Sequence, residues 1–131
     1  MSKTIHVSGT RKMARARATL NPGKGKIKIN GVFLENYGGE FNRLRIQEPL
    51  VLAGDIIKKV DISVITHGGG VNGQSDAARL AIARALVVYD KKLKMVFNEY
   101  DRLLLVADVR RKEVCKPNDS KARAKRQKSY R

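Results

Sequence analysis

The chain has 131 residues, a formal net charge of +16 at pH 7 and a hydrophobic fraction of 42%. This length predicts a single domain with a hydrophobic core, and apolar runs shorter than about 20 residues argue against a membrane span. The single cysteine, Cys115, excludes an internal disulfide. Because the N-terminus also has no apolar signal region, we expect a cytoplasmic protein.

The excess positive charge lies at the two ends of the sequence. Residues 1–30 carry eight basic and no acidic side chains, residues 110–131 carry ten basic and two acidic ones, and residues 31–109 carry ten of each. We therefore expect a globular RNA-binding domain over residues 1–109 and an extended basic tail over 110–131. Such clustering is typical of proteins that bind nucleic acid, whereas solubility alone requires only a modest net charge.

The first predicted strands lie within residues 5–29. Residues 5–7 begin a strand, and a change of phase after Gly9 predicts a bulge before the alternation resumes over residues 12–20. Residues 26–29 alternate again after a turn. Paired as a hairpin, the segments 12–20 and 26–29 would place four cations on one face: Arg15, Arg17, Lys26 and Lys28. Like charges on one sheet face repel each other unless an anion neutralises them, so this face predicts an RNA contact; the alternative is a solvated outer face.

Two helical segments flank the centre of the chain. Residues 40–47 predict a short helix whose Phe41 and Leu44 face the core, and Pro49 is expected to break it. Residues 93–104 follow a second helical stripe of apolar side chains. Neither segment carries a motif for catalysis, so both are expected to serve the core.

The central segment, residues 58–89, is expected to form the core. Its start alternates as a half-buried strand, glycines at 68–70 end that strand, and residues 77–88 are apolar except for two arginines. A helix that is apolar nearly all round is usually buried, and its alanines permit close approach to a sheet. The glycine turn is expected to let the backbone approach RNA or another strand, and the helix N-terminus could hold a phosphate.

The same glycines match nucleotide-binding motifs only in part. Gly68-x-Gly70-x-x-Gly73 matches the dinucleotide fingerprint, but Asp90, which would bind the ribose, lies at a helix end. The stretch also resembles a phosphate loop in which Gln74 replaces the phosphate-binding lysine. A nucleotide-binding or phosphotransferase protein is therefore the alternative from a different class.

The remaining reactive side chains do not form a site in the sequence. His6 and His67 lack cysteine or carboxylate partners at the spacing of metal ligands. Cys115 lies among basic residues that would favour the thiolate, but no histidine is near it in sequence. We expect no enzyme activity, no cofactor and no metal.

Four stretches carry a resemblance to a known family: GTRKMARARATLNPGKGKIKING, QEPL, ITHGGGVNGQSDAARLAIARAL and KRQKSYR. In this order the chain resembles the small-subunit ribosomal protein S-nine family, and VADVRRKE and QKSYR are similar to its archaeal and eukaryotic form. The resemblance implies an α/β (α+β) fold, an S-five second-domain-like two-layer sandwich with a mixed sheet covered by helices. It also implies binding to small-subunit rRNA in the head, neighbouring head proteins as partners, and contact of the tail with peptidyl-site tRNA during translation.

The residues expected to bind rRNA are either cationic or belong to the glycine turn: Arg11, Lys12, Arg15, Arg17, Lys24, Lys26, Lys28, Gly68, Gly69, Gly70, Arg110, Arg111 and Lys112. The resemblance implies that tRNA is contacted by tail residues: Arg126, Lys128, Ser129, Tyr130 and Arg131. A stand-alone RNA-binding module or an RNA-processing cofactor would share this charge pattern, so it is the alternative within the RNA-binding class.

Overall fold

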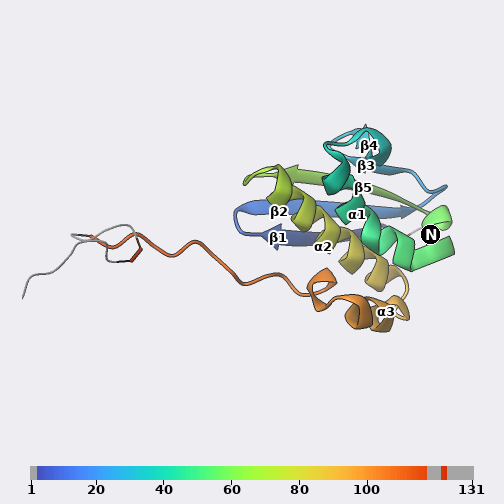
Figure 1. The fold of residues 1–131 in the computed structure, drawn as a ribbon. Coiled ribbons are helices and arrows are strands. Elements are labelled where there is room, and N and C mark those ends of the chain that lie inside the picture. The colour runs from blue at the N-terminus through green and yellow to red at the C-terminus, as the bar shows by residue number, and fades with distance from the viewer. Residues whose placement is uncertain (1–2, 118–121, 124–131) are drawn as a thin grey trace, which may run out of the picture.

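The strands of the protein form one mixed sheet with helices on a single side. The computed structural model describes residues 3–117 and 122–123, and within them a five-stranded sheet packs against three α-helices (Figure 1). The elements in chain order are β1 (Ile5–Arg11), β2 (Ala14–Pro22), β3 (Ile27–Ile29), β4 (Val32–Phe33), η1 (Leu34–Asn36), α1 (Glu40–Ala53), η2 (Gly54–Lys59), β5 (Val60–His67), α2 (Val71–Tyr89), α3 (Leu93–Tyr100) and η3 (Arg102–Leu104). The predicted two-layer α+β arrangement is confirmed. Among the described helices, none combines the length and the apolar character that a bilayer span requires.

The strand order is β1-β2-β5-β3-β4. β5 pairs antiparallel with β2, where Ala18 lies opposite Val64, and parallel with β3, where Ile29 lies opposite Val64. The predicted hairpin between residues 12–20 and 26–29 is therefore wrong, because β5 lies between the two segments. Alternation shows which side chains of a strand face the core, but it does not identify the neighbouring strand.

The predicted bulge after Gly9 is also wrong. β1 runs unbroken to Arg11, and a turn at Lys12 and Met13 reverses the chain into β2. Lys12 adopts a φ of 52°, a left-handed conformation that hairpin turns usually assign to asparagine or glycine. The phase change in the sequence therefore marks a hairpin turn that lacks the usual turn residues.

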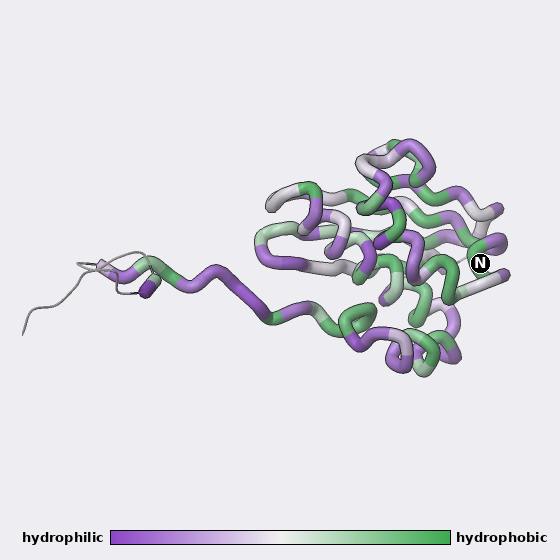
Figure 2. The backbone as a smooth tube through the Cα atoms, in the orientation of Figure 1, coloured by the Kyte–Doolittle hydropathy of each residue, from purple (hydrophilic) through white to green (hydrophobic). Residues whose placement is uncertain are grey.

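Gly9 instead allows α2 to approach the sheet closely. A Cβ atom at this position would lie 2.5 Å from the Ala77 carbonyl oxygen and 2.7 Å from the Ala81 nitrogen. Alanines complete the interface, since Ala16 on β2 and both helix alanines have no exposed surface. Small side chains on the helix and strands thus set a short distance between the layers. Figure 2 shows hydrophobic residues concentrated in this body and mostly hydrophilic residues along the segment that leaves it.

α1 differs from its prediction in length and orientation. The helix continues through Pro49 to Ala53, and its core-facing side chains include Ile46, Pro49 and Leu50. Burial of this last turn compensates for the hydrogen bond that proline cannot donate. Phe41 and Leu44, which were expected in the core, are 74% and 54% exposed. α1 therefore presents apolar side chains to solvent.

We predict that Gly9→Ser destabilises the protein by about 1–3 kcal/mol, because the added side chain would overpack the interface with α2. Gly39→Ser is the matched control: Gly39 has an ordinary φ of −78° at the N-cap of α1, and a Cβ there would have no neighbour within 4 Å. Since serine is a favoured N-cap residue, this control should change stability by less than about 0.5 kcal/mol. Urea unfolding measures both, and equal losses would contradict the close-approach argument.

Candidate nucleic-acid interface

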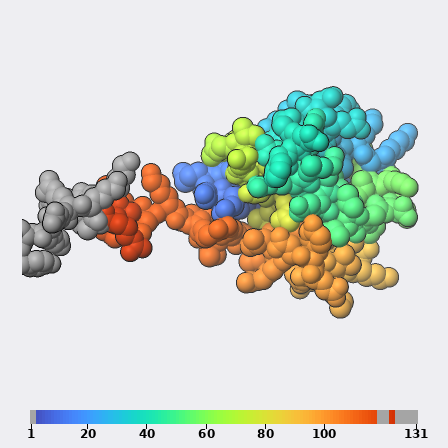
Figure 3. Space-filling view, in the orientation of Figure 1, coloured from blue at the N-terminus to red at the C-terminus, as the bar shows by residue number. Residues whose placement is uncertain are grey.

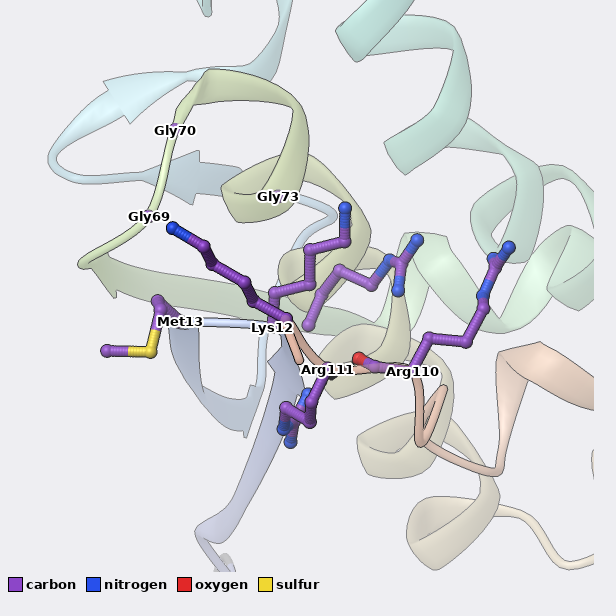
Figure 4. Close-up of a pocket in the computed structure, with 9 residues that line it drawn as sticks. Lys12, Met13, Gly69, Gly70, Gly73, Arg110 and Arg111 are labelled. Carbon is purple, nitrogen blue, oxygen red and sulfur yellow. Dashed lines mark hydrogen bonds between the residues drawn. The ribbon is translucent and has the colours of Figure 1, made fainter. Parts of the chain in front are cut away.

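A basin of about 810 Å³ lies where three segments meet: the turn between β1 and β2, the loop between β5 and α2, and the start of the tail (Figure 4). We call it the cationic basin, and its lining residues are Arg11, Lys12, Met13, Gly69, Gly70, Gly73, Arg110, Arg111 and Lys112. Five of these nine residues are cationic, and three are glycines that leave backbone accessible. Guanidinium and ammonium groups beside open backbone are the chemistry that proteins use to bind phosphate.

The three glycines of the loop have different roles. Gly68 and Gly69 adopt positive φ values of 74° and 62°, and Cβ atoms there would lie 2.7 Å from the Met13 oxygen and 2.9 Å from the Ala14 nitrogen. These two glycines therefore let the loop pack against the β1–β2 turn, which is protein rather than RNA. Gly70 has an ordinary φ, and a Cβ there would meet nothing within 4 Å. It lines the basin, and the open space around it lets an external ligand approach its backbone.

The side chain of Gln74 stabilises the glycine loop through two hydrogen bonds. Its Nε2 donates to the Gly68 carbonyl at 3.1 Å, and its Oε1 accepts from the Thr66 hydroxyl at 3.3 Å. Thr66 is itself fixed by Asn30, whose Oδ1 accepts from the Thr66 backbone nitrogen at 2.8 Å. Gln74 occupies the position of the phosphate-binding lysine in a phosphate loop. Here its side chain instead bonds the backbone of the glycine loop.

Asp108 joins the start of the tail to the β1–β2 hairpin. Its Oδ2 accepts from Arg110 Nε at 2.8 Å, and its Oδ1 accepts from the Arg110 backbone nitrogen at 3.0 Å. Arg11 Nη1 lies 3.0 Å from Asp108 Oδ2 as an ion pair that lacks hydrogen-bonding geometry. The hydrogen bonds from Arg110, together with the charge of Arg11, hold the pKa of Asp108 far below its ordinary value of 3.8. The carboxylate therefore stays ionised at physiological pH and keeps two arginines beside the basin.

Arg84 on α2 fixes the chain just before Asp108. Its Nε donates to the Leu105 carbonyl at 2.9 Å, and its Nη1 donates to the Ser8 carbonyl of β1 at 3.1 Å. Beyond this anchor, residues 110–112 line the basin, and residues 113–117 then leave the body as extended chain (Figures 1 and 3). Val109 and Val114 are 86% and 77% exposed. The tail thus begins from a defined point on the edge of the sheet.

The face of the sheet opposite the helices continues the cationic surface. We call it the open sheet face; its outward side chains include His6, Ser8, Arg15, Arg17, Lys28, Ser63, Ile65 and His67. A concavity of about 440 Å³ shares Lys12 and Arg111 with the basin and adds Arg15 and Arg17. A second one of about 370 Å³ continues from Arg17 to Ile65. The basin and this face therefore form one connected surface.

Most of the predicted rRNA-binding residues gather at this end of the sheet. Seven of them line the basin: Arg11, Lys12, Gly69, Gly70, Arg110, Arg111 and Lys112. Arg15 and Arg17 lie beside it. Lys28 lies on the far side of β5, opposite Ser63, with its Nζ 4.9 Å from the centre of the Phe33 ring.

Lys24 and Lys26 lie elsewhere, in the loop between β2 and β3 at the opposite end of the sheet. Their backbone nitrogens donate to Asp61 Oδ1 at 2.9 and 2.8 Å. These hydrogen bonds, the one from Lys26 first, lower the pKa of Asp61. The four strand cations predicted as one cluster are therefore separated, because β5 lies between their strands. The predicted tRNA-binding residues, from Arg126 to Arg131, lie outside the described residues.

Sequence reasoning missed several residues that shape the interface. Asp108 and Arg84 position the tail, and Asp76 pairs with Arg45 at 3.0 Å and with Arg11 at 3.7 Å. The spacing Asp108-x-Arg110 was a weak signal, since an aspartate two residues before an arginine can accept its backbone nitrogen. The long-range pairs had no local signal.

Comparison with known proteins shows the family of the chain. The chain matches the family described as "Ribosomal protein S9/S16" over residues 9–131, which include every residue that lines the basin. It is 47% identical over 125 residues to the "Small ribosomal subunit protein uS9" of Pyrobaculum aerophilum, covering 94% of this chain and 88% of that protein. It is 51% identical over 129 residues to the protein of the same description from Thermoplasma volcanium, covering 97% of this chain and 98% of that protein.

We predict that Asp108→Asn frees the start of the tail without unfolding the body. Amide exchange in residues 106–112 should accelerate by about tenfold or more, because local opening no longer breaks charge-assisted hydrogen bonds. Asp55→Asn is the control, since Asp55 is 90% exposed and pairs only with the nearby Lys58 in the described residues. Hydrogen-exchange mass spectrometry measures both variants, and unchanged exchange in Asp108→Asn would contradict the anchoring role.

Proposed function

Because this chain belongs to the ribosomal protein S9/S16 family, we propose that it binds rRNA of the small-subunit head through the cationic basin and touches peptidyl-site tRNA through its tail. Family membership makes the chain a structural, non-enzymatic constituent of the small ribosomal subunit. Its partners are accordingly rRNA and neighbouring ribosomal proteins. The observation that supports the RNA site most directly is the convergence of five cations from two distant segments on one basin.

The basin offers RNA two kinds of contact. Arg111 can bind a phosphate with two parallel hydrogen bonds, whereas Lys12 and Lys112 act as compact charges. The first turn of α2 adds backbone donors, because Gly70 provides no side-chain cap and the first hydrogen bond within the helix begins at Gln74. Contacts of this type position the protein on the RNA backbone and read little base sequence. Specificity then follows from the shape of the folded RNA.

The open sheet face extends the same contact. Arg15 and Arg17 project from β2 beside the basin, and Arg111 lines both the basin and the adjoining concavity. An RNA backbone that enters the basin can therefore continue across β2 without leaving cationic surface. Asp61 is a carboxylate on the same side of the sheet. Its Oδ1 already accepts three backbone hydrogen bonds from residues 24–26, which lie at the end of the sheet opposite the basin.

The proposed tRNA contact is supported by the direction and charge of the tail. Residues 113–117 lead away from the body, so the residues after them can reach RNA that the body does not touch. Residues 121–131 contain six basic and no acidic side chains. The resemblance assigns the tRNA contact to Arg126, Lys128, Ser129, Tyr130 and Arg131, with the basic groups on phosphates.

We predict that replacing Lys12, Arg111 and Lys112 by glutamine weakens binding of the full chain to rRNA. The slope of log K against log salt should fall by about 2–3, because each phosphate contact contributes about 0.7–0.9. The matched control replaces Lys91, Lys92 and Lys94, which are equally charged, exposed and outside the basin. Filter binding at several salt concentrations measures both slopes; equal changes in the two variants would reject the basin as the RNA site.

Deleting residues 128–131 should leave thermal unfolding and incorporation into small subunits unchanged. It should weaken tRNA binding in the peptidyl site by about tenfold, since it removes two cations and an aromatic ring from the proposed contact. A chain with Lys91→Gln and Lys92→Gln is the control, because it loses the same charge from the body. Binding of tRNA to reconstituted subunits measures the effect. Normal tRNA affinity after the deletion would contradict the tail contact.

A further inference from the structure

A second surface of different chemistry lies on the helical side of the protein. A groove of about 210 Å³ between α1 and α3 is lined by Leu44, Gln47, Glu48, Val51, Leu52 and Tyr100. We call it the α1–α3 groove. Figure 3 shows the green surface of α1 beside the orange surface of α3 on this face. The groove belongs to the helical layer, whereas the proposed RNA surface is formed by the hairpin end and the open face of the sheet.

The walls of the groove expose large apolar side chains. Leu44 and Val51 on α1 are 54% and 77% exposed, and Phe41, one turn before Leu44, is 74% exposed. Tyr100 on the opposite side is 55% exposed. The spacing of 41, 44 and 51 places the α1 side chains along one stripe of the helix. A contiguous apolar stripe of this kind is typical of a protein–protein contact site.

The charges beside this stripe are the carboxylates of Glu40 and Glu48 and the guanidinium of Arg45, whose Cζ lies 5.8 Å from the centre of the Phe41 ring. Glu40, Leu44 and Glu48 follow each other at intervals of four residues, so they lie on successive turns of the same helix face. The arginines of α1 have partners of their own: Arg43 Nη1 donates to the Glu35 carbonyl at 2.8 Å, and Arg45 Nη1 pairs with Asp76 at 3.0 Å, which offsets its charge. This part of a strongly basic protein therefore presents apolar surface between two acidic groups, which disfavours a phosphate backbone.

An ion-paired bridge links the two helices that form the groove. Arg79 on α2 has a side chain that is only 13% exposed, and its Nε donates to Glu48 Oε2 at 2.8 Å. Its Nη2 also donates to Asp101 Oδ2, at the end of α3, at 3.1 Å. Arg79 thereby ties α1 to α3 across α2, so the groove is preformed and needs no rearrangement to accept a partner.

We propose that the α1–α3 groove docks a basic segment of a neighbouring small-subunit protein. An apolar side chain of that segment seats between Leu44, Val51 and Tyr100, and its lysines or arginines pair with Glu40 and Glu48. Charge complementarity selects this occupant: Arg79 offsets only one of the two negative charges of Glu48 and Asp101, and Glu40 adds another, so the groove attracts a cationic peptide and repels RNA. The proposal is independent of the RNA site, which lies on other elements.

The first test places a photoreactive benzophenone side chain at position 51 of the full chain, assembled into small subunits. Irradiation should link it to a ribosomal protein, at a peptide rich in lysine and arginine. A label at position 65, on the open sheet face, is the matched probe, because Ile65 is 60% exposed and should react with rRNA. Linkage of position 51 to rRNA, to a second copy of this chain or to no partner would overturn the docking proposal. Position 65 reports separately on the proposed function.

The second test uses the double variant Leu44→Asp with Val51→Asp, whose sites are exposed and should tolerate the change. Its affinity for isolated rRNA should stay within about twofold of the parent chain, while its dissociation from assembled subunits should accelerate by about tenfold. The matched control is Val88→Asp with Met95→Asp, because these residues are 56% and 71% exposed and lie outside the groove. Equal dissociation of both double variants, or unchanged dissociation of the first, would overturn the proposal.

Discussion

The close packing of α2 against β1 and β2 is the constraint on which the rest of the structure depends. Gly9 makes this packing possible, because a Cβ atom at this position would lie only 2.5 Å from the Ala77 carbonyl oxygen. At the other end of the interface, Gly69 lets the loop before α2 lie against Ala14 of β2. The same close approach brings the start of α2 beside the β1–β2 turn, and two walls of the cationic basin are formed there. Loss of this packing would therefore remove the basin together with the core.

The acidic residues near the basin stabilise the positions of its cations. Asp108 binds Arg110 and pairs with Arg11, and Asp76 pairs with both Arg11 and Arg45. Hydrogen bonds to an ionised carboxylate are stronger than neutral ones, so these carboxylates fix Arg11 and Arg110, while no carboxylate partner is found for Lys12 and Lys112 within the described residues. A charged surface with fixed groups loses less side-chain entropy when it binds RNA than a flexible one would.

The two layers of the fold have different surface chemistry. The open sheet face and the basin expose cations, whereas the α1–α3 groove exposes apolar side chains between Glu40 and Glu48. Apolar surface gains free energy when a protein partner covers it, and a polyanion cannot supply that gain. In this chain the two kinds of surface lie on separate elements and can be varied independently.

The sequence by itself determined the buried strand and helix of residues 60–88 and the location of the excess charge at the two ends, because periodicity and composition are local properties. The tertiary structure alone decided that β5 separates Arg15 and Arg17 from Lys28, that the chain turns at Lys12, and that Phe41 faces solvent. It also decided which cations share the basin, since residues 11–12 and 110–112 meet only in the folded chain. Alternation specifies which side of an element is buried, but the neighbour of that element depends on contacts between distant residues.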